Sequence, residues 1–98
     1  MSKTYKFNAK IWLYPGNAAW HFVSLPKKEA EEIKALQAGR PRRGWGAIYA
    51  DVTIGKTSWR TSIFPDKKSG TYLLPLKSEV RKKEGLMNGD NIVVNLKI

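Results

Sequence analysis

Residues 70–98 read GTYLLPLKSEVRKKEGLMNGDNIVVNLKI, and they predict an order of strand, short helix, turn and strand. Two rows of side chains alternate over 71–76, which is the period of a β-strand. Pro75 cannot donate to a central ladder, so we expect the strand to end there or to run along an edge. Ser78 is expected to cap a helix over 79–84, and Gly85 to end that helix in the left-handed conformation.

The remainder of the stretch predicts a return to strand. Leu86 and Met87 are expected to fold back onto the core, and a turn is expected over 88–90. Alternation then predicts a closing strand with one apolar face, formed by Ile92, Val94, Leu96 and Ile98.

This order of parts resembles the AbrB/MazE swapped-hairpin module. In that module a strand leads through proline into a short basic helix, which is followed by a Gly-Asp turn and a last strand. The residues that carry the resemblance are Leu74-Pro75, Arg81-Lys82, Leu86 and Gly89-Asp90.

The N-terminal half repeats the same order. Strands are predicted over 5–13 and 20–25, and a helix over 27–38 with Pro26 in its first position and Gly39 at its end. Leu25-Pro26 matches Leu74-Pro75, and residues 36–39 match 86–89. Such a duplication predicts a pseudo-twofold barrel that closes within one chain, whereas chance similarity between two short helices is the alternative.

Two further strands are predicted over 45–54 and 57–64, joined by a tight turn at Gly55-Lys56. We therefore predict a mainly β fold in a single domain over 1–98: a small six-stranded, pseudo-twofold (double-split) β-barrel with two short capping helices. Most aromatic residues are expected inside it. The expected core aromatics are Trp20, Phe22, Trp59 and Phe64, and those expected to cover a barrel end are Trp12 and Trp45.

Four motifs along the chain are similar to the bacterial domain of unknown function 1905. They read WHFVSLP over 20–26, RGWG over 43–46, IGKTSWRTSIFP over 54–65 and YLLPLK over 72–77, with Arg81 following. The resemblance implies a double-split, pseudo-twofold barrel and no established activity.

Composition narrows the class of protein. The chain has 98 residues, 42% of them apolar, which excludes intrinsic disorder. No apolar run approaches the roughly 20 residues of a membrane span, so no membrane partner is expected and we expect a cytoplasmic protein. The net charge of +10 favours a polyanionic partner, and a merely solvated basic surface is the alternative.

The sequence contains few residues that could act in catalysis or bind a metal. His21 is the single histidine and there is no cysteine, so we expect no metal site, no cofactor and no enzyme. The Gly55-Lys56-Thr57 sequence resembles the end of a phosphate-binding loop. It lacks the earlier glycine and the following helix, and is therefore interpreted as a turn.

The hypothesis from sequence is a monomeric, non-enzymatic binding module for nucleic acid or another polyanion, which contacts phosphates through loops at one barrel end. Trp45 and Tyr49 would offer stacking surfaces. The residues predicted to bind are Arg40, Arg42, Arg43, Lys56, Arg60, Lys67 and Lys68. The alternative is a small-ligand or protein-interaction pocket, formed by Trp59, Thr61, Ser62, Tyr72, Lys77 and Arg81.

Overall fold

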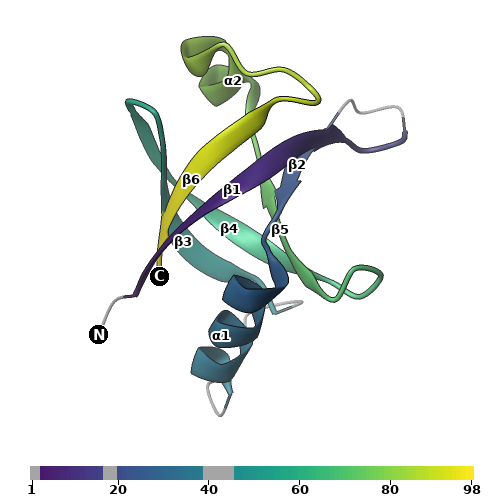
Figure 1. Cartoon of the computed structure of the whole chain (residues 1–98), viewed down its shortest axis with the longest axis vertical. Coiled ribbons are helices and arrows are strands. Elements are labelled where there is room, and N and C mark those ends of the chain that lie inside the picture. Colours follow the sequence, from purple (N-terminus) through teal and green to yellow (C-terminus); the bar gives the residue numbers. More distant parts are fainter. Residues whose placement is uncertain (1–2, 17–19, 39–45) are drawn as a thin grey trace.

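The computed structural model describes residues 3–16, 20–38 and 46–98, which form the six strands and two helices that the sequence predicts (Figure 1). In chain order they are β1 (Thr4–Leu13), β2 (His21–Ser24), α1 (Lys27–Gln37), β3 (Ile48–Ile54), β4 (Thr57–Asp66), β5 (Thr71–Pro75), α2 (Ser78–Glu84) and β6 (Asn91–Lys97).

The strands close into a barrel in the order β1-β2-β5-β4-β3-β6, and every neighbouring pair is antiparallel. Each of the two longest strands, β1 and β4, pairs with two other strands along different parts of its length. β1 pairs with β6 from Thr4 to Lys10 and then with β2. β4 pairs with β3 up to Ile63 and then with β5. These two divided strands make the barrel double-split.

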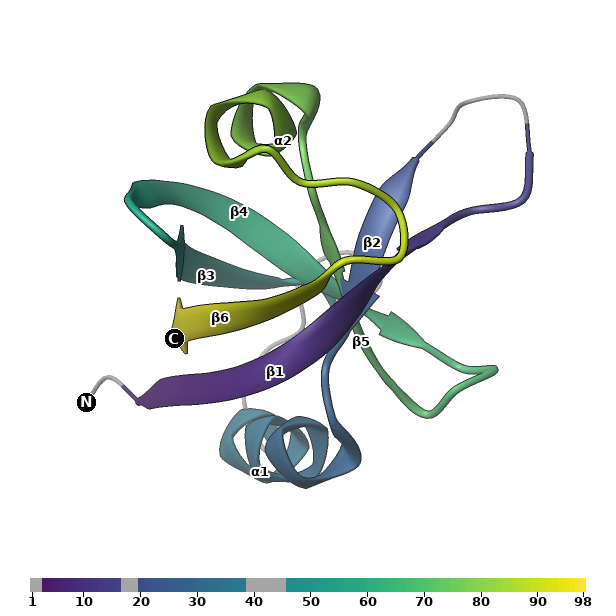
Figure 2. The ribbon, with the colours of Figure 1, turned by 45° about the horizontal axis from the view of Figure 1, so that its top comes forward.

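The two halves of the chain are topologically equivalent. Exchanging β1, β2 and β3 for β4, β5 and β6 leaves the ring of pairings unchanged, and each half carries its helix between its second and third strands. The helices lie on opposite sides of the barrel (Figures 1 and 2). The predicted six-stranded barrel with two short helices is therefore confirmed.

Alternating side chains from all six strands fill the barrel. Full burial of a large apolar side chain stabilises the folded state by about 1.5–3 kcal/mol relative to leaving it in water. The largest fully buried side chains are Ile11, Val23, Ile33, Val52, Ile63, Leu74, Val94 and Leu96. Ile33 belongs to α1, which therefore closes one opening of the barrel rather than lying on its surface.

Helix ends differ in detail from the prediction. Gly85 is left-handed, with φ 63°, as predicted. Ser78 does not cap α2: the capping position is held by Lys77, no side chain bonds the helix end, and Ser78 is the first helical residue. Pro26 likewise precedes α1 as its capping residue. Pro26 and Lys77 are both extended, with ψ of 152°, and neither helix start has a side-chain cap.

Three predicted core positions are wrong. Met87 is 69% exposed, Trp20 is 54% exposed and Phe64 is 37% exposed. Strand parity explains Phe64, because Ile63 takes the inward position on β4 and turns its neighbour outward. Trp20 precedes β2, and Met87 lies in the connection between α2 and β6, so neither is placed in the core by a strand. Phe22 is half-buried because Val23 takes the inward position on β2, whereas Trp59 packs against the core as predicted.

Candidate functional site

Of the basic residues predicted to bind polyanions, those in the described ranges do not gather at one end of the barrel. Arg40, Arg42 and Arg43, together with Trp45, lie outside the described residues. Lys56 precedes β4, and Lys67 and Lys68 follow it (Figure 1). The ten-residue strand separates them by about 33 Å at the usual rise per residue. One compact ligand cannot contact both turns.

Arg60 occupies the middle of β4 on the outward side. Its guanidinium carbon lies 4.9 Å from the ring centre of Tyr49. Tyr49 is 51% exposed, and a cation already covers one face of its ring. That pair is therefore a weaker stacking surface than the sequence suggested.

The predicted pocket residues separate into three environments. Trp59 and Thr61 face inward from β4, opposite Val52 and Ala50. Tyr72 is buried in β5. Ser62 pairs with Tyr49 on the outer side. Two of the six predicted residues, Lys77 and Arg81, line the pocket at the start of α2.

A group of four aromatic side chains on the β1–β2 hairpin was not predicted as a site. Trp12, Tyr14, Trp20 and Phe22, called the aromatic cluster below, face the outside of the barrel. Phe22 lies at its centre: ring centroids are 5.3 Å away for Trp12, 6.2 Å for Tyr14 and 5.9 Å for Trp20, whose ring is stacked on it. Trp12 and Tyr14 are 6.4 Å apart.

The hairpin backbone and one side-chain bond hold the cluster in place. Trp12 is the register partner of Phe22, and the Tyr14 amide donates to the Trp20 carbonyl at 2.8 Å. The indole Nε1 of Trp12 donates to Ser24 Oγ at 3.0 Å. Rings fixed in this way lose little conformational entropy when a ligand stacks on them.

The barrel itself does not require this cluster. β4 and β5 occupy the equivalent place in the second half, and their outward side carries one aromatic residue, Phe64. Tyr14 and Trp20 are 51% and 54% exposed, so each leaves a large apolar ring surface in water. A contiguous exposed group of this kind indicates an interaction surface.

The strands beneath the cluster favour an anionic ligand. β1, β2 and β5 contain no Asp or Glu. Lys6 and Lys10 are exposed on the same outward side of β1 as Trp12, because they alternate with the buried Tyr5 and Phe7. Their register partners across the β1–β6 ladder are the neutral Asn95 and Asn91.

A pocket adjoins the cluster at the junction of β5 and α2. It is an open depression of about 270 Å³, lined by Trp20, His21, Pro75, Leu76, Lys77, Ser78 and Arg81, none of which is acidic. Arg81 Nε donates to the Leu76 carbonyl at 3.2 Å, and the Leu76 amide donates to the His21 carbonyl at 2.9 Å.

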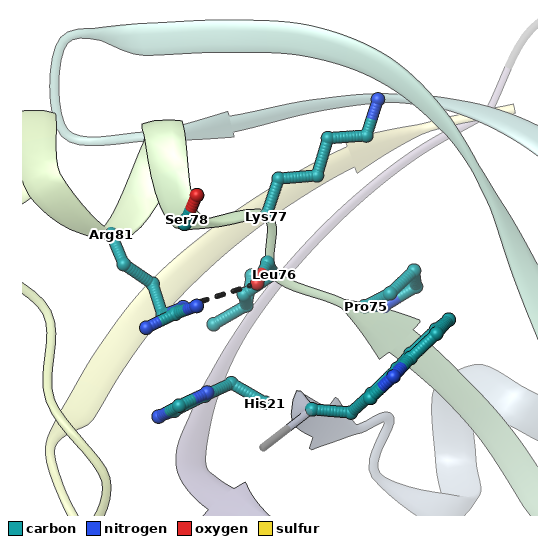
Figure 3. Close-up of a pocket in the computed structure, with 7 residues that line it drawn as sticks. His21, Pro75, Leu76, Lys77, Ser78 and Arg81 are labelled. Atoms are coloured by element: carbon teal, nitrogen blue, oxygen red, sulfur yellow. Dashed lines mark hydrogen bonds between the residues drawn. The ribbon is translucent and has the colours of Figure 1, made fainter. Parts of the chain in front are cut away.

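Figure 3 shows how the polar side chains of this pocket are directed. The guanidinium of Arg81 and the ring of His21 point to the same side of the segment from Pro75 to Ser78. The ammonium of Lys77 points away from both. The pocket therefore presents Arg81 as its oriented cation, with Lys77 contributing charge at the rim.

The described ranges contain no group of three His, Cys, Asp or Glu side chains that are close enough together to hold a metal ion. Neither helix in the described ranges has the length and apolar character needed to span a bilayer.

Sequence reasoning missed the aromatic cluster because it assigned Trp20 and Phe22 to the core on hydrophobicity alone. A usable signal was present. Trp12 shares the face of β1 that carries Lys6 and Lys10, so an aromatic residue interrupts an otherwise polar row.

A comparison with protein families gives one match that spans most of the chain. The family described as Domain of unknown function (DUF1905) matches residues 7–96. No curated protein matches the chain.

Proposed function

The chain belongs to the DUF1905 family, and we propose that it is a binding module for single-stranded nucleic acid, with bases stacked on the aromatic cluster. The observation that carries this proposal is the exposed stack formed by Trp20 on Phe22, with Tyr14 beside it, on strands without acidic residues. Base–aromatic stacking is worth about 1–3 kcal/mol per base and tolerates any sequence.

Phosphate contacts come from lysines around the cluster. Lys6 and Lys10 continue the outward row of β1 beyond Trp12, and Lys77 lies at the rim of the adjoining pocket. Three such contacts predict a log–log salt slope of about −2 for a single strand. Affinity should then fall about 20-fold between about 50 and 200 mM salt.

Single strands are preferred over duplexes for a geometric reason. Bases inside a duplex are stacked on one another, so their faces are not available to Trp20 or Tyr14. The described part of α1 places Ala30 and Ile33 into the core, and α2 is a two-turn helix that buries Val80. Neither is a free recognition helix for the major groove.

The direct test compares Trp20→Ala with Tyr49→Ala. Both residues are exposed aromatics, at 54% and 51%, and only the first belongs to the cluster. We expect Trp20→Ala to weaken binding of a single strand of about eight nucleotides by 5- to 150-fold, which is about 1–3 kcal/mol. Tyr49→Ala should change the affinity less than twofold, and both variants should keep the wild-type unfolding midpoint.

Titration of intrinsic tryptophan fluorescence with unlabelled oligonucleotides measures these affinities. Equal losses of affinity in the two variants would show that the single strand does not bind specifically at the aromatic cluster. Wild-type affinity in Trp20→Ala would contradict the proposal outright. A duplex of the same sequence should bind at least tenfold more weakly than the single strand.

The basic segment over 40–43 stays part of the proposal as a second source of phosphate contacts. Replacing Arg42 and Arg43 together with alanine should weaken binding and flatten the salt slope by about 1.4, at about 0.7 per lost contact. An unchanged slope would remove that segment from the interface. We further propose a cytoplasmic monomer, because the barrel closes within one chain and lacks cysteine.

A small anionic ligand is the second candidate function, and the pocket at the start of α2 favours it. About 270 Å³ is slightly below the usual 300–1,000 Å³ of small-molecule sites. A thermal-shift screen of organic anions tests this candidate, since a ligand that binds only the folded state raises the unfolding midpoint.

A further inference from the structure

We propose that the pocket beside the aromatic cluster holds the terminal phosphate of the bound strand, so that the protein prefers nucleic acids with a phosphorylated end. This inference rests on the proposed function and names the part of the ligand that the pocket recognises. The pocket and the cluster share Trp20. A nucleotide stacked on that ring therefore has its own phosphate within reach of Arg81.

Arg81 is oriented for this role by the main chain. Its Nε donates to the Leu76 carbonyl at 3.2 Å, and Leu76 is buried, with 3% of its surface exposed. The terminal amino groups of the guanidinium have no hydrogen-bond partner among the described residues. A guanidinium held by one edge offers these donors as a planar fork that matches two phosphate oxygens.

The charge of the pocket favours a phosphate over a neutral group. Its lining includes the cations Arg81 and, at the rim, Lys77, and no carboxylate. Within the described ranges no acidic side chain forms an ion pair with Lys77 or Arg81. The guanidinium of Arg81 and the ring of His21 lie on the same side of the pocket (Figure 3), so both can face one bound group.

The pocket distinguishes a terminal from an internal phosphate by charge. A terminal phosphomonoester carries a charge of about −1.5 to −2 at pH 7 and has three free oxygens. An internal phosphodiester carries a single charge and is continued by chain on both sides.

The test uses three unlabelled oligonucleotides of one sequence, with a 5′-phosphate, with a 3′-phosphate or with hydroxyl groups at both ends. We expect one phosphorylated form to bind wild-type protein about 5- to 20-fold more tightly than the hydroxyl form. The quantity compared between variants is this ratio. Arg81→Ala should reduce it to less than twofold, and Arg81→Lys, which keeps the charge without the fork, should leave an intermediate ratio.

Lys82→Ala is the matched control. Lys82 is exposed on the same helix, and its replacement removes the same charge outside the pocket. It should preserve the wild-type ratio. If Lys82→Ala lowers the ratio as much as Arg81→Ala does, general charge explains the preference and the pocket assignment is overturned.

The outcomes separate this inference from the proposed function. Tight binding of all three oligonucleotides with a ratio near one overturns the pocket assignment and leaves the stacking surface intact. Failure of all three to bind overturns both. A nucleoside monophosphate that binds as tightly as the phosphorylated strand also overturns the terminal-strand assignment, because the strand then adds nothing to a free nucleotide.

Discussion

Trp12 and Trp59 lie on opposite sides of the barrel wall, and their indole nitrogens have different partners. Trp12 Nε1 donates to Ser24 Oγ, whereas Trp59 Nε1 is buried without a hydrogen-bond partner in the described residues. An unsatisfied buried donor costs about 1–3 kcal/mol. The packing of the Trp59 ring against the core must therefore outweigh this cost, while Trp12 is oriented by its bond.

Ser24→Ala tests the orientation of Trp12. Loss of its acceptor should lower the free energy of unfolding by about 1 kcal/mol and weaken single-strand binding two- to fivefold, because the Trp12 ring gains freedom. Urea denaturation and oligonucleotide titration measure the two effects. Ser62→Ala is the control, since Ser62 is also half-buried on the outer side but lies on β4. A larger binding loss in the control would contradict this assignment.

Asp66 gives the clearest pH dependence at the scale of one residue. Its carboxylate accepts hydrogen bonds from Ser69 Oγ at 2.6 Å and from the Ser69 amide at 3.3 Å. The Ser69 side chain is the main reason that the pKa of Asp66 is lowered below its usual 3.8. A depressed folded-state pKa stabilises the protein above pH 3.8, and this contribution is lost as pH falls through the folded-state value.

We therefore expect Asp66→Ala to lower the free energy of unfolding at pH 7 by at most about 1 kcal/mol, because the turn is exposed. The difference from wild type should shrink when urea denaturation is repeated near pH 3. A difference that grows as the pH falls would have the wrong sign for this mechanism.

At the scale of elements, one carboxylate fastens α2 to the turn between β3 and β4. Glu84, the last residue of α2, accepts from Thr57 Oγ1 at 2.6 Å and from the Lys56 amide at 3.3 Å. Gly55 leaves the space that this carboxylate occupies, because a Cβ there would collide with it. The same helix carries Arg81, so this contact also positions the pocket.

Comparison of Gly55→Ala with Gly70→Ala separates the stability lost to backbone strain from the stability lost when the Glu84 contact is disrupted. Both glycines have positive φ, +59° and +73°, but a Cβ at Gly70 would meet nothing within 4 Å. Both variants should be destabilised by strain of about 1 kcal/mol. Gly55→Ala should lose about 1–2 kcal/mol more, because Glu84 must give up its hydrogen bonds. Equal urea midpoints in the two variants would show that the Glu84 contact contributes nothing.

Elements were more predictable from the sequence than the site. Period-two alternation located the strands, and the Leu-Pro steps with Gly85 located α2, because those signals are local. The outward position of Trp20 and Phe22 depends on their register with β1 and β5, which is set by distant residues. Likewise, the distance between Lys56 and Lys67 follows from the ten-residue length of β4, not from their common loop character.

For the whole molecule, the two halves meet along four of the six ladders, β2–β5, β3–β6, β1–β6 and β3–β4. Leu74 packs opposite Val23 where β5 meets β2, and Leu96 opposite Val52 where β6 meets β3. All four side chains are fully buried. Because each of these ladders joins one half to the other, neither half has a complete core, and we expect the barrel to unfold as one unit.

Leu74→Ala and Leu96→Ala test this cooperativity. Each should lower the free energy of unfolding by about 2–5 kcal/mol. Both should keep a single urea transition whose midpoint is the same by circular dichroism and by tryptophan fluorescence. Two separated transitions in either variant would mean that the halves fold independently. The double variant should approach complete unfolding, since a domain of this size is stable by only about 5–15 kcal/mol.

The pairing of the first strand with the last also governs when the barrel can form during synthesis. Thr4 pairs with Lys97, so β1 leaves the ribosome long before most of its partner exists. At about 5–20 residues per second, that wait is roughly 5 to 20 s. Throughout it, the apolar row of β1 and the rings of Trp12 and Tyr14 are exposed on an incomplete chain. The nascent protein should therefore depend on chaperones until β6 emerges, and a slowly translated message should aggregate more than a fast one.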